Sequence, residues 1–197
     1  MTTGVVLLAA GQSQRFGSDK RIASLRQKSL YSDSDQVLFQ TLGHIRLARL
    51  PVFVVLHRGD EQLASRLTRL RVDWGVCPDA HLGMGHSLAY GVRCCQHWHN
   101  WLIALADMPW ITPLSYRKIA AAISPGQIIR PCYRATPDGQ PQPGNPVAFS
   151  RRYGWQLMQC RGDTGARQLL QQYHQQVIRL PLDDPGILCD IDTPQQL

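Results

Sequence analysis

The chain of 197 residues is 44% hydrophobic and 18% charged, which is typical of one globular domain with a well-formed core. No apolar run approaches the roughly eighteen residues of a membrane span, and no basic stretch of a signal peptide is present, so we expect a cytoplasmic protein without a membrane partner. The formal net charge of +7 suits a polyanionic small substrate, whereas the scattered arginines, not interleaved with aromatic residues, argue against a nucleic-acid-binding protein.

Four strand–loop–helix units are predicted in the first 126 residues. Apolar runs predict strands at 4–10, 52–56 and 101–106, and a short third strand is predicted at 71–77. Apolar side chains recur at helical spacing over 38–45, 63–70, 88–95 and 116–123. Asp60 is expected to cap the second helix, and Thr112 followed by Pro113 is a typical start for the fourth.

This alternation predicts an α/β fold: a single domain with a mainly parallel twisted sheet and helices on both faces. Right-handed crossovers would place the loop after each strand at the carboxyl edge of the sheet, where open α/β folds bind ligands. We therefore expect four loops to converge on one crevice, namely 8–20, 57–60, 78–85 and 107–109.

The pattern changes after residue 126. A strand is predicted at 128–133, then a loop or hairpin tip at 135–146, a short strand at 147–149 and two short helices, the second capped by Asp163. An acidic turn, 190–194, precedes a last helical stub. The six cysteines show no metal-binding spacing and are predicted to be reduced thiols.

The strongest chemical signal is the loop LAAGQSQRFGSDK at 8–20. It is neither a Walker A loop nor a GxGxxG loop, but its physical logic is similar. Gly11 and Gly17 allow backbone amides to approach an anion, while Arg15 and Lys20 add positive charge. The alternative interpretation is an ordinary surface loop with incidental charges.

Asp107 is the second candidate. A carboxylate at the end of a buried strand, followed by a Met-Pro turn, is a suitable hard-oxygen ligand for Mg²⁺. It could instead cap the next helix, although Thr112 is a better cap. Asp190 and Asp192 in the acidic turn are candidates for a second carboxylate or an acceptor contact, or are simply turn residues.

Several segments, taken in order, resemble the MobA-like nucleotidyltransferases, particularly the molybdenum cofactor cytidylyltransferases (MocA type). These are the loop at 8–20, GMGHSL at 83–88, ADMP at 106–109, GNPVAF at 144–149, GDTGAR at 162–167 and DIDTP at 190–194. The resemblance implies the GT-A-like nucleotide-diphospho-sugar transferase architecture, with a nucleotide-binding half at 1–126 and an acceptor-binding half at 127–197. Two departures are Asn145, where histidine is common, and Phe16 in place of methionine.

The loops and the resemblance together assign roles to individual residues. The predicted catalytic residues are Lys20, Arg15 and Asp107, and the predicted metal ligands are Asp107 and Asp190. The predicted nucleotide contacts are Leu8, Ala9, Ala10, Gly11, Arg15, Lys20, Asp79, Gly85 and Ser87. The predicted acceptor contacts are Asn145, Asp163, Arg167 and Asp192. Ser87 and Asp163 could equally be helix caps.

The resemblance implies Mg²⁺-dependent transfer of CMP from CTP to the phosphate of molybdopterin, with release of pyrophosphate. The LAAG form, rather than LAGG, favours a cytidylyl donor. Such a reaction needs no strong general base, in agreement with the lack of a Ser–His–Asp or Cys–His set. The alternatives are a guanylyl or other MobA-like transferase with a different acceptor, and a non-catalytic carrier of molybdenum cofactor. A molybdenum hydroxylase is the expected client.

Overall fold

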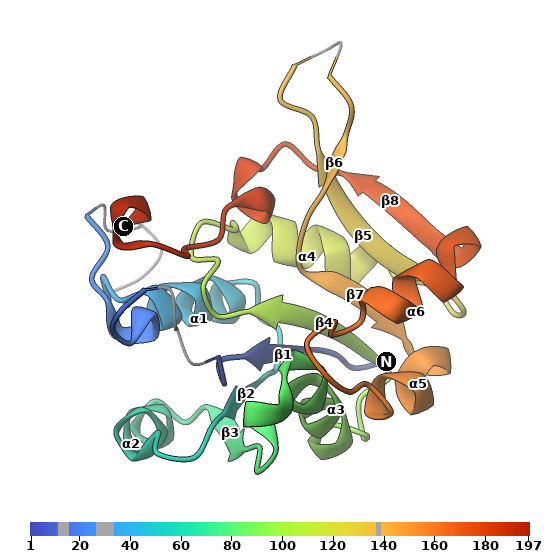
Figure 1. The fold of residues 1–197 in the computed structure, drawn as a ribbon. Helices are drawn as coiled ribbons and strands as arrows, with labels where there is room; N and C mark the ends of the chain where they lie inside the picture. Colours follow the sequence, from blue (N-terminus) through green and yellow to red (C-terminus); the bar gives the residue numbers. More distant parts are fainter. Residues whose placement is uncertain (12–15, 27–33, 137–138) are drawn as a thin grey trace.

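The computed structural model describes residues 1–11, 16–26, 34–136 and 139–197, which contain one mixed sheet of eight strands (Figure 1). The strands are β1 (Thr3–Leu8), β2 (Val52–Leu56), β3 (Asp73–Val76), β4 (Asn100–Leu105), β5 (Ile128–Tyr133), β6 (Gln142–Pro143), β7 (Val147–Ser150) and β8 (Val177–Pro181). Their order is β3-β2-β1-β4-β7-β5-β6, with β8 paired to β5. The predicted mainly parallel sheet is confirmed.

Strand direction decides where the loops meet. β3, β2, β1 and β4 are parallel, while β7 runs antiparallel to both β4 and β5. β5 therefore points the same way as β4, and β8 is parallel to β5. The carboxyl ends of β1 to β5 consequently share one edge of the sheet, and β7 begins at that edge.

Helices cover both faces of the sheet, as the sequence predicts (Figure 1). They are α1 (Val37–Leu47), α2 (Glu61–Arg69), α3 (Met84–Cys94), α4 (Pro113–Ala122), α5 (Gly154–Met158) and α6 (Arg167–Gln172). Residues of α1, α2 and α4 pack into one apolar cluster, and residues of α3, α5 and α6 pack into another on the opposite face. None of the described helices is long and apolar enough to cross a membrane.

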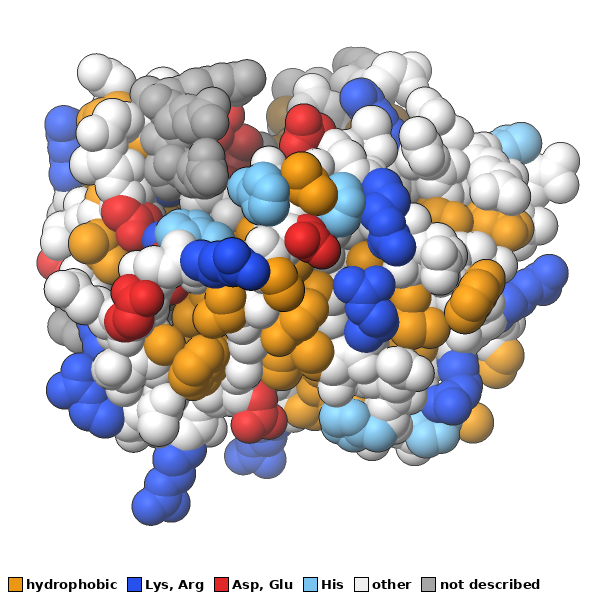
Figure 2. All heavy atoms as spheres, turned by 60° about the horizontal axis from the view of Figure 1, so that its bottom comes forward, with side chains coloured by type: hydrophobic (Ala, Val, Ile, Leu, Met, Phe, Trp, Pro, Cys, Tyr) orange, Lys and Arg blue, Asp and Glu red, His pale blue; other side chains and the backbone are white. Residues whose placement is uncertain are grey.

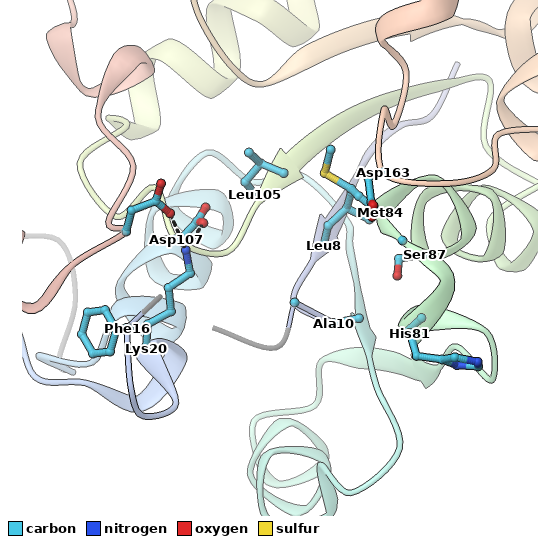
Figure 3. A pocket seen from close by; sticks show the side chains of 14 residues that line it. Leu8, Ala10, Phe16, Lys20, His81, Met84, Ser87, Leu105, Asp107 and Asp163 are labelled. Carbon is cyan, nitrogen blue, oxygen red and sulfur yellow. Dashed lines mark hydrogen bonds and ion pairs between the residues drawn. The ribbon is translucent and has the colours of Figure 1, made fainter. Parts of the chain in front are cut away.

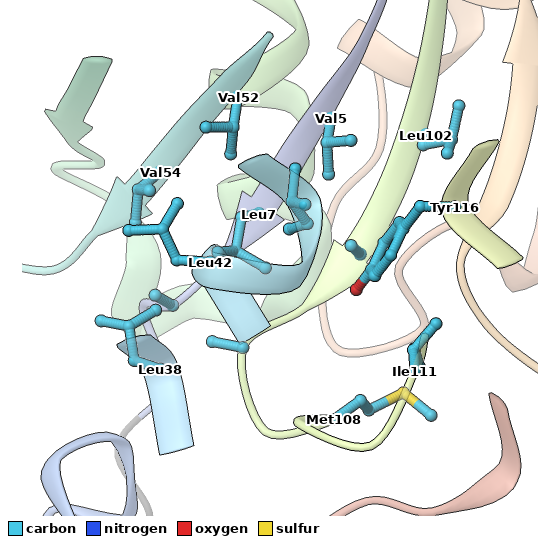
Figure 4. Close-up of a cluster of buried hydrophobic side chains, with 14 of the residues drawn as sticks. Val5, Leu7, Leu38, Leu42, Val52, Val54, Leu102, Met108, Ile111 and Tyr116 are labelled. Carbon is cyan, nitrogen blue, oxygen red and sulfur yellow. The ribbon is translucent and has the colours of Figure 1, made fainter. Parts of the chain in front are cut away.

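Alternation along β1 divides its side chains between the two clusters. Val5 and Leu7 face α1, whose Leu38 and Leu42 lie over them, and Tyr116 of α4 closes the same cluster (Figure 4). All five side chains are buried. Truncating any one of these leucines to alanine would cost about 2–5 kcal/mol. This packing fixes the strands that carry the loops at the carboxyl edge.

Three predicted helix caps have different outcomes. The hydroxyl of Thr112 accepts a hydrogen bond from the Ser115 amide, so that prediction is confirmed. Asp60 stands at the start of α2, but its carboxylate makes no bond to the helix amides, because Arg21 binds it instead. Asp163 does not cap α6, whose N-cap position is Ala166. The prediction of a side-chain cap is wrong in both of these cases.

The chain after β8 returns to the sheet edge. The buried carboxylate of Asp184 accepts hydrogen bonds from the amide and hydroxyl of Thr112 and from the hydroxyl of Ser115, which ties this segment to the start of α4. Further along, the amide of Ile191 donates to the backbone oxygen of Asp107 over 2.9 Å. The acidic turn is thereby placed directly beside the end of β4.

Candidate active site

A pocket of about 520 Å³ opens where β1 and β4 end. Leu8 and Leu105 are register partners, so Ala10 and Asp107, each two residues further on, leave the sheet side by side. Figure 3 shows Lys20 and Asp107 on one side of the pocket and Ser87, Met84 and Asp163 on the other. The lining residues are Leu8, Ala10, Gly11, Phe16, Lys20, Ala80, His81, Gly83, Met84, Ser87, Leu105, Asp107, Asp163 and Asp192.

One wall is a lysine enclosed by oxygen atoms. Lys20 Nζ donates to Asp107 Oδ2 over 2.7 Å, to the backbone oxygen of Ile191 over 2.8 Å and to Asp192 Oδ1 over 3.1 Å. These partners lie 87 or more residues away in sequence. The Leu8–Lys20 loop, the end of β4 and the acidic turn are thus joined at one ammonium group.

Burial and neighbouring charges both shift the pKa values of Lys20 and Asp107. Burial raises the pKa of Asp107, although the Lys20 ammonium opposes that change. Burial by itself would lower the pKa of Lys20, but the carboxylates of Asp107 and Asp192 outweigh burial and the pKa is raised. Lys20 is therefore a positively charged group at neutral pH.

The second oxygen of Asp107 bears on metal binding. Asp107 Oδ1 is buried and accepts no hydrogen bond from the described residues. An unsatisfied buried carboxylate oxygen is costly, and hard oxygen atoms are what Mg²⁺ and Mn²⁺ prefer. Within the described residues no three His, Cys, Asp or Glu side chains form a metal cage. The residues present therefore fit a cation that takes one protein carboxylate and completes its shell with phosphate and water oxygens.

Helix α1 fixes the turn that carries Asp107. The buried Thr41 hydroxyl donates to the backbone oxygen of Ala106, and the buried Gln40 amide donates to that of Pro109. The Asp107 backbone oxygen is bonded to Ile191, as described above. The carboxylate therefore projects from a turn whose backbone is held on both sides.

Arg21, which sequence reasoning missed, anchors the segment next to Lys20. Its guanidinium donates to both oxygens of Asp60 over 2.6 Å, to both oxygens of Asp19 over 2.8 Å and to the backbone oxygen of Ala9 over 2.6 Å. Its side chain is 7% exposed and that of Asp60 is 4% exposed. Through this network Arg21, which lies in the short 3₁₀ helix Lys20–Ile22, connects Ala9 after β1 with Asp60 after β2.

The glycine-containing loop has room for a ligand. A Cβ atom added at Gly11 would meet no atom of the described residues within 4 Å, so packing against them does not require glycine there. Leu8 and Ala10 line the pocket, whereas Ala9 points into the cluster on the opposite face and its backbone oxygen binds Arg21. Phe16 is buried against Leu25 and Ile191, so it packs the segment before Lys20 against the acidic turn.

The opposite wall comes from the segment after β3 and from the loop before α6. Ser87 is 4% exposed and lines the pocket from within α3, together with Met84 and Asp163. Gly85 lies behind this wall, where its amide donates to Gly162 over 2.7 Å. Any Cβ at Gly85 would collide with the backbone of Arg161, so close packing requires glycine at that position.

The predicted site residues are only partly brought together. Eight line the pocket, namely Leu8, Ala10, Gly11, Lys20, Ser87, Asp107, Asp163 and Asp192. Ala9, Asp79, Gly85, Asn145, Arg167 and Asp190 lie outside the lining, although the charge of Asp190 contributes to the raised pKa of Asp107. Arg15 lies outside the described residues. The loop at 57–60, expected in the crevice, supplies none of the described lining residues; His57 and Asp60 contact the Arg21 guanidinium instead.

Charged groups gather on the face that carries α2 and α3. Figure 2 shows acidic side chains, histidines and basic side chains close together in its upper middle.

Comparisons with known proteins agree with this geometry. A family model described as the MobA-like NTP transferase domain matches residues 5–177. The purine catabolism protein PucB of Bacillus subtilis (strain 168) is 29% identical over 198 residues, covering 97% of this chain and 92% of that protein. Nicotine blue oxidoreductase of Paenarthrobacter nicotinovorans is 25% identical over 195 residues, covering 98% and 93%.

Solved structures show the same fold. Rv0371c from Mycobacterium tuberculosis H37Rv aligns with a TM-score of 0.76 and 26% identity, covering 100% of this chain and 95% of that chain. Its complex with manganese aligns with the same TM-score at 24% identity, covering 100% and 96%.

Proposed function

Because the chain belongs to the MobA-like NTP transferase family, we propose that its pocket transfers CMP from CTP to the phosphate of molybdopterin and releases pyrophosphate. The observation that carries this proposal is the joining of Lys20, Asp107 and Asp192 at the common end of β1 and β4. A cation and a carboxylate at 2.7 Å, beside a glycine with open space in front of it, suit a triphosphate and its divalent cation.

Each side chain has a defined task in this proposal. Lys20 neutralises charge on the phosphate oxygens as pyrophosphate leaves, and its position is maintained by the three oxygen atoms around it. Asp107 holds a divalent cation, which would supply further charge neutralisation when bound. The backbone at Ala10 and Gly11 lies along the triphosphate.

The acceptor phosphate makes a general base unnecessary. It is already ionised at neutral pH, so the reaction depends on alignment of the nucleophile with the α-phosphorus and on neutralisation of the charge. Asp163 and Asp192, which line the pocket from the acceptor half, are proposed to accept hydrogen bonds from uncharged parts of the acceptor, because carboxylates would repel its phosphate. Arg15 is proposed to assist Lys20 on the triphosphate.

The sequence motifs support the proposed donor and acceptor. The Ala9-Ala10 pair before Gly11 supports CTP over GTP, and the motifs at 144–149, 162–167 and 190–194 support molybdopterin. A molybdenum hydroxylase is the proposed client of the product. The cation is proposed to be Mg²⁺. Because Rv0371c has been solved with manganese, Mn²⁺ belongs in the same test.

The test is pyrophosphate release from CTP, GTP, ATP and UTP, each with and without molybdopterin, and with Mg²⁺, Mn²⁺ or a chelator. We expect release only with CTP, molybdopterin and a divalent cation, and a product whose mass equals that of molybdopterin plus CMP. Preferential release from GTP would overturn the cytidylyl assignment. Tight pterin binding without release from any nucleotide would identify a carrier instead. One relative is named an oxidoreductase, so loss of NADPH absorbance is a useful control.

A further inference from the structure

Arg130 of β5 lies between buried apolar side chains of its own strand and does not line the pocket. Along β5, Ile128 and Cys132 are buried on one face of the sheet, and Arg130 lies between them. The Nε atom of Arg130 is buried and has no hydrogen-bond partner among the described residues. A buried donor left unpaired costs free energy, so its position calls for a physical explanation.

Two more arginines surround Arg130. Arg179 is its register partner on the neighbouring strand β8, and Arg167 begins α6, which lies beside β5 and β8 (Figure 1). These three residues are called the arginine cluster below. Burial lowers the pKa of Arg130, and the charges of Arg179 and Arg167 lower it further.

The described residues supply no carboxylate partner for this charge: none of the three guanidinium groups forms an ion pair or a side-chain hydrogen bond with them. By contrast, the buried Arg21 has two carboxylate partners. Arg130 is partly buried, whereas Arg167 and Arg179 are exposed, so the cluster is open to an anion from solution. Such an anion would relieve the repulsion among the three like charges.

The arginine cluster is on the same side of the sheet as the pocket. Val147 of β7 is opposite Ile103 of β4, and continuing the printed register places Val147 beside Arg130. Leu105, two residues beyond Ile103, lines the pocket. β4 and β5 are separated only by β7, so two strand spacings put the cluster roughly 10 Å across the sheet from β4. The pocket and the cluster are also close along the chain, because Asp163, which lines the pocket, is only four residues before Arg167.

We propose that Arg130, Arg167 and Arg179 bind an oxyanion, a phosphate or a carboxylate, of a ligand that lies beside the pocket. This anion is not the molybdopterin phosphate, because that group is the one that attacks the nucleotide in the proposed function. The anion site itself does not require turnover. Guanidinium groups are suited to this task because they bind oxyanions with paired hydrogen bonds.

The test uses the full chain without nucleotide. Inorganic phosphate and acetate are titrated separately while the Nε–Hε signals of arginine are followed by NMR, and the Arg130 signal is assigned from the Arg130→Gln variant. We expect phosphate or acetate to shift the Arg130 signal. Arg130→Gln, followed through the Arg179 signal, and Arg179→Gln, followed through the Arg130 signal, should each weaken that binding roughly tenfold. The matched control is Arg117→Gln, an exposed arginine on α4 at the opposite face, which should bind as the wild type does.

Three results would overturn the proposal: an Arg130 signal that neither anion shifts, unchanged binding in both variants, or an equal loss in Arg117→Gln. A turnover arm separates the two proposals. If no nucleotide supports transfer but phosphate still shifts Arg130, the proposed function fails and the anion site stands.

Discussion

Replacing Arg21 by leucine should lower the free energy of unfolding by about 3–5 kcal/mol, because it removes the guanidinium that neutralises the buried Asp60 carboxylate and leaves the His57 amide as a remaining hydrogen-bond donor. The pair is almost fully removed from solvent, and both oxygens of Asp60 accept from the guanidinium over 2.6 Å. The same substitution removes the bonds to Asp19 and to the Ala9 backbone. For a chain of this length, the loss corresponds to a fall in Tm of roughly 6–20 °C.

Urea denaturation followed by circular dichroism measures this change. The double variant Arg21→Leu with Asp60→Leu should recover most of the loss, since removing both charges abolishes the unpaired buried carboxylate. Arg58→Leu is the control, because Arg58 is exposed one residue after His57 and should change stability by less than about 0.5 kcal/mol. A loss below about 1 kcal/mol for Arg21→Leu would refute the reasoning, because exposed ion pairs contribute no more than that.

Three further predictions concern stability. Asp184→Asn should lower the free energy of unfolding by about 1.5–3 kcal/mol, measured by urea denaturation, because the carboxylate accepts from both Thr112 and Ser115. Tyr116→Phe should be neutral or raise Tm, since the buried Tyr116 hydroxyl has no partner among the described residues; a clear loss would reveal a hidden one. Burial lowers the pKa of His44, so the unfolded chain binds its proton first. Stability should therefore fall as pH drops below about 6.5, and His44→Gln should flatten that dependence in melts at pH 5 to 8.

The strands and helices of the first half could be predicted because local pattern and tertiary environment agree. The run at 52–56 coincides with β2, and Thr112 caps α4 as its residue type indicates. β8 lies outside the strands that the sequence predicts. Its sequence VIRLP is interrupted by Arg179 and ends in proline, and three of its five side chains are exposed, so no buried apolar run marks it. Its place is decided by pairing with β5.

The candidate site shows why some contacts escape sequence reasoning. A carboxylate at a helix start usually caps the helix, but at Asp60 a guanidinium 39 residues earlier in the chain takes both oxygens. Arg21 carries no signal of burial in its own sequence, since arginine is usually exposed. The proximity of Lys20 to Asp107 was expected from the shared sheet edge. The direct ion pair depends on the returning acidic turn, which only the fold reveals.

The role of the Lys20–Asp107 pair is tested most directly by single-turnover transfer from α-labelled CTP to molybdopterin. Wild-type protein, Lys20→Met and Asp107→Asn are compared after thermal melts establish that all three are folded. The account predicts labelled product with wild-type protein and a fall in rate of roughly a hundredfold or more in each variant. Near-normal transfer by either folded variant would contradict it.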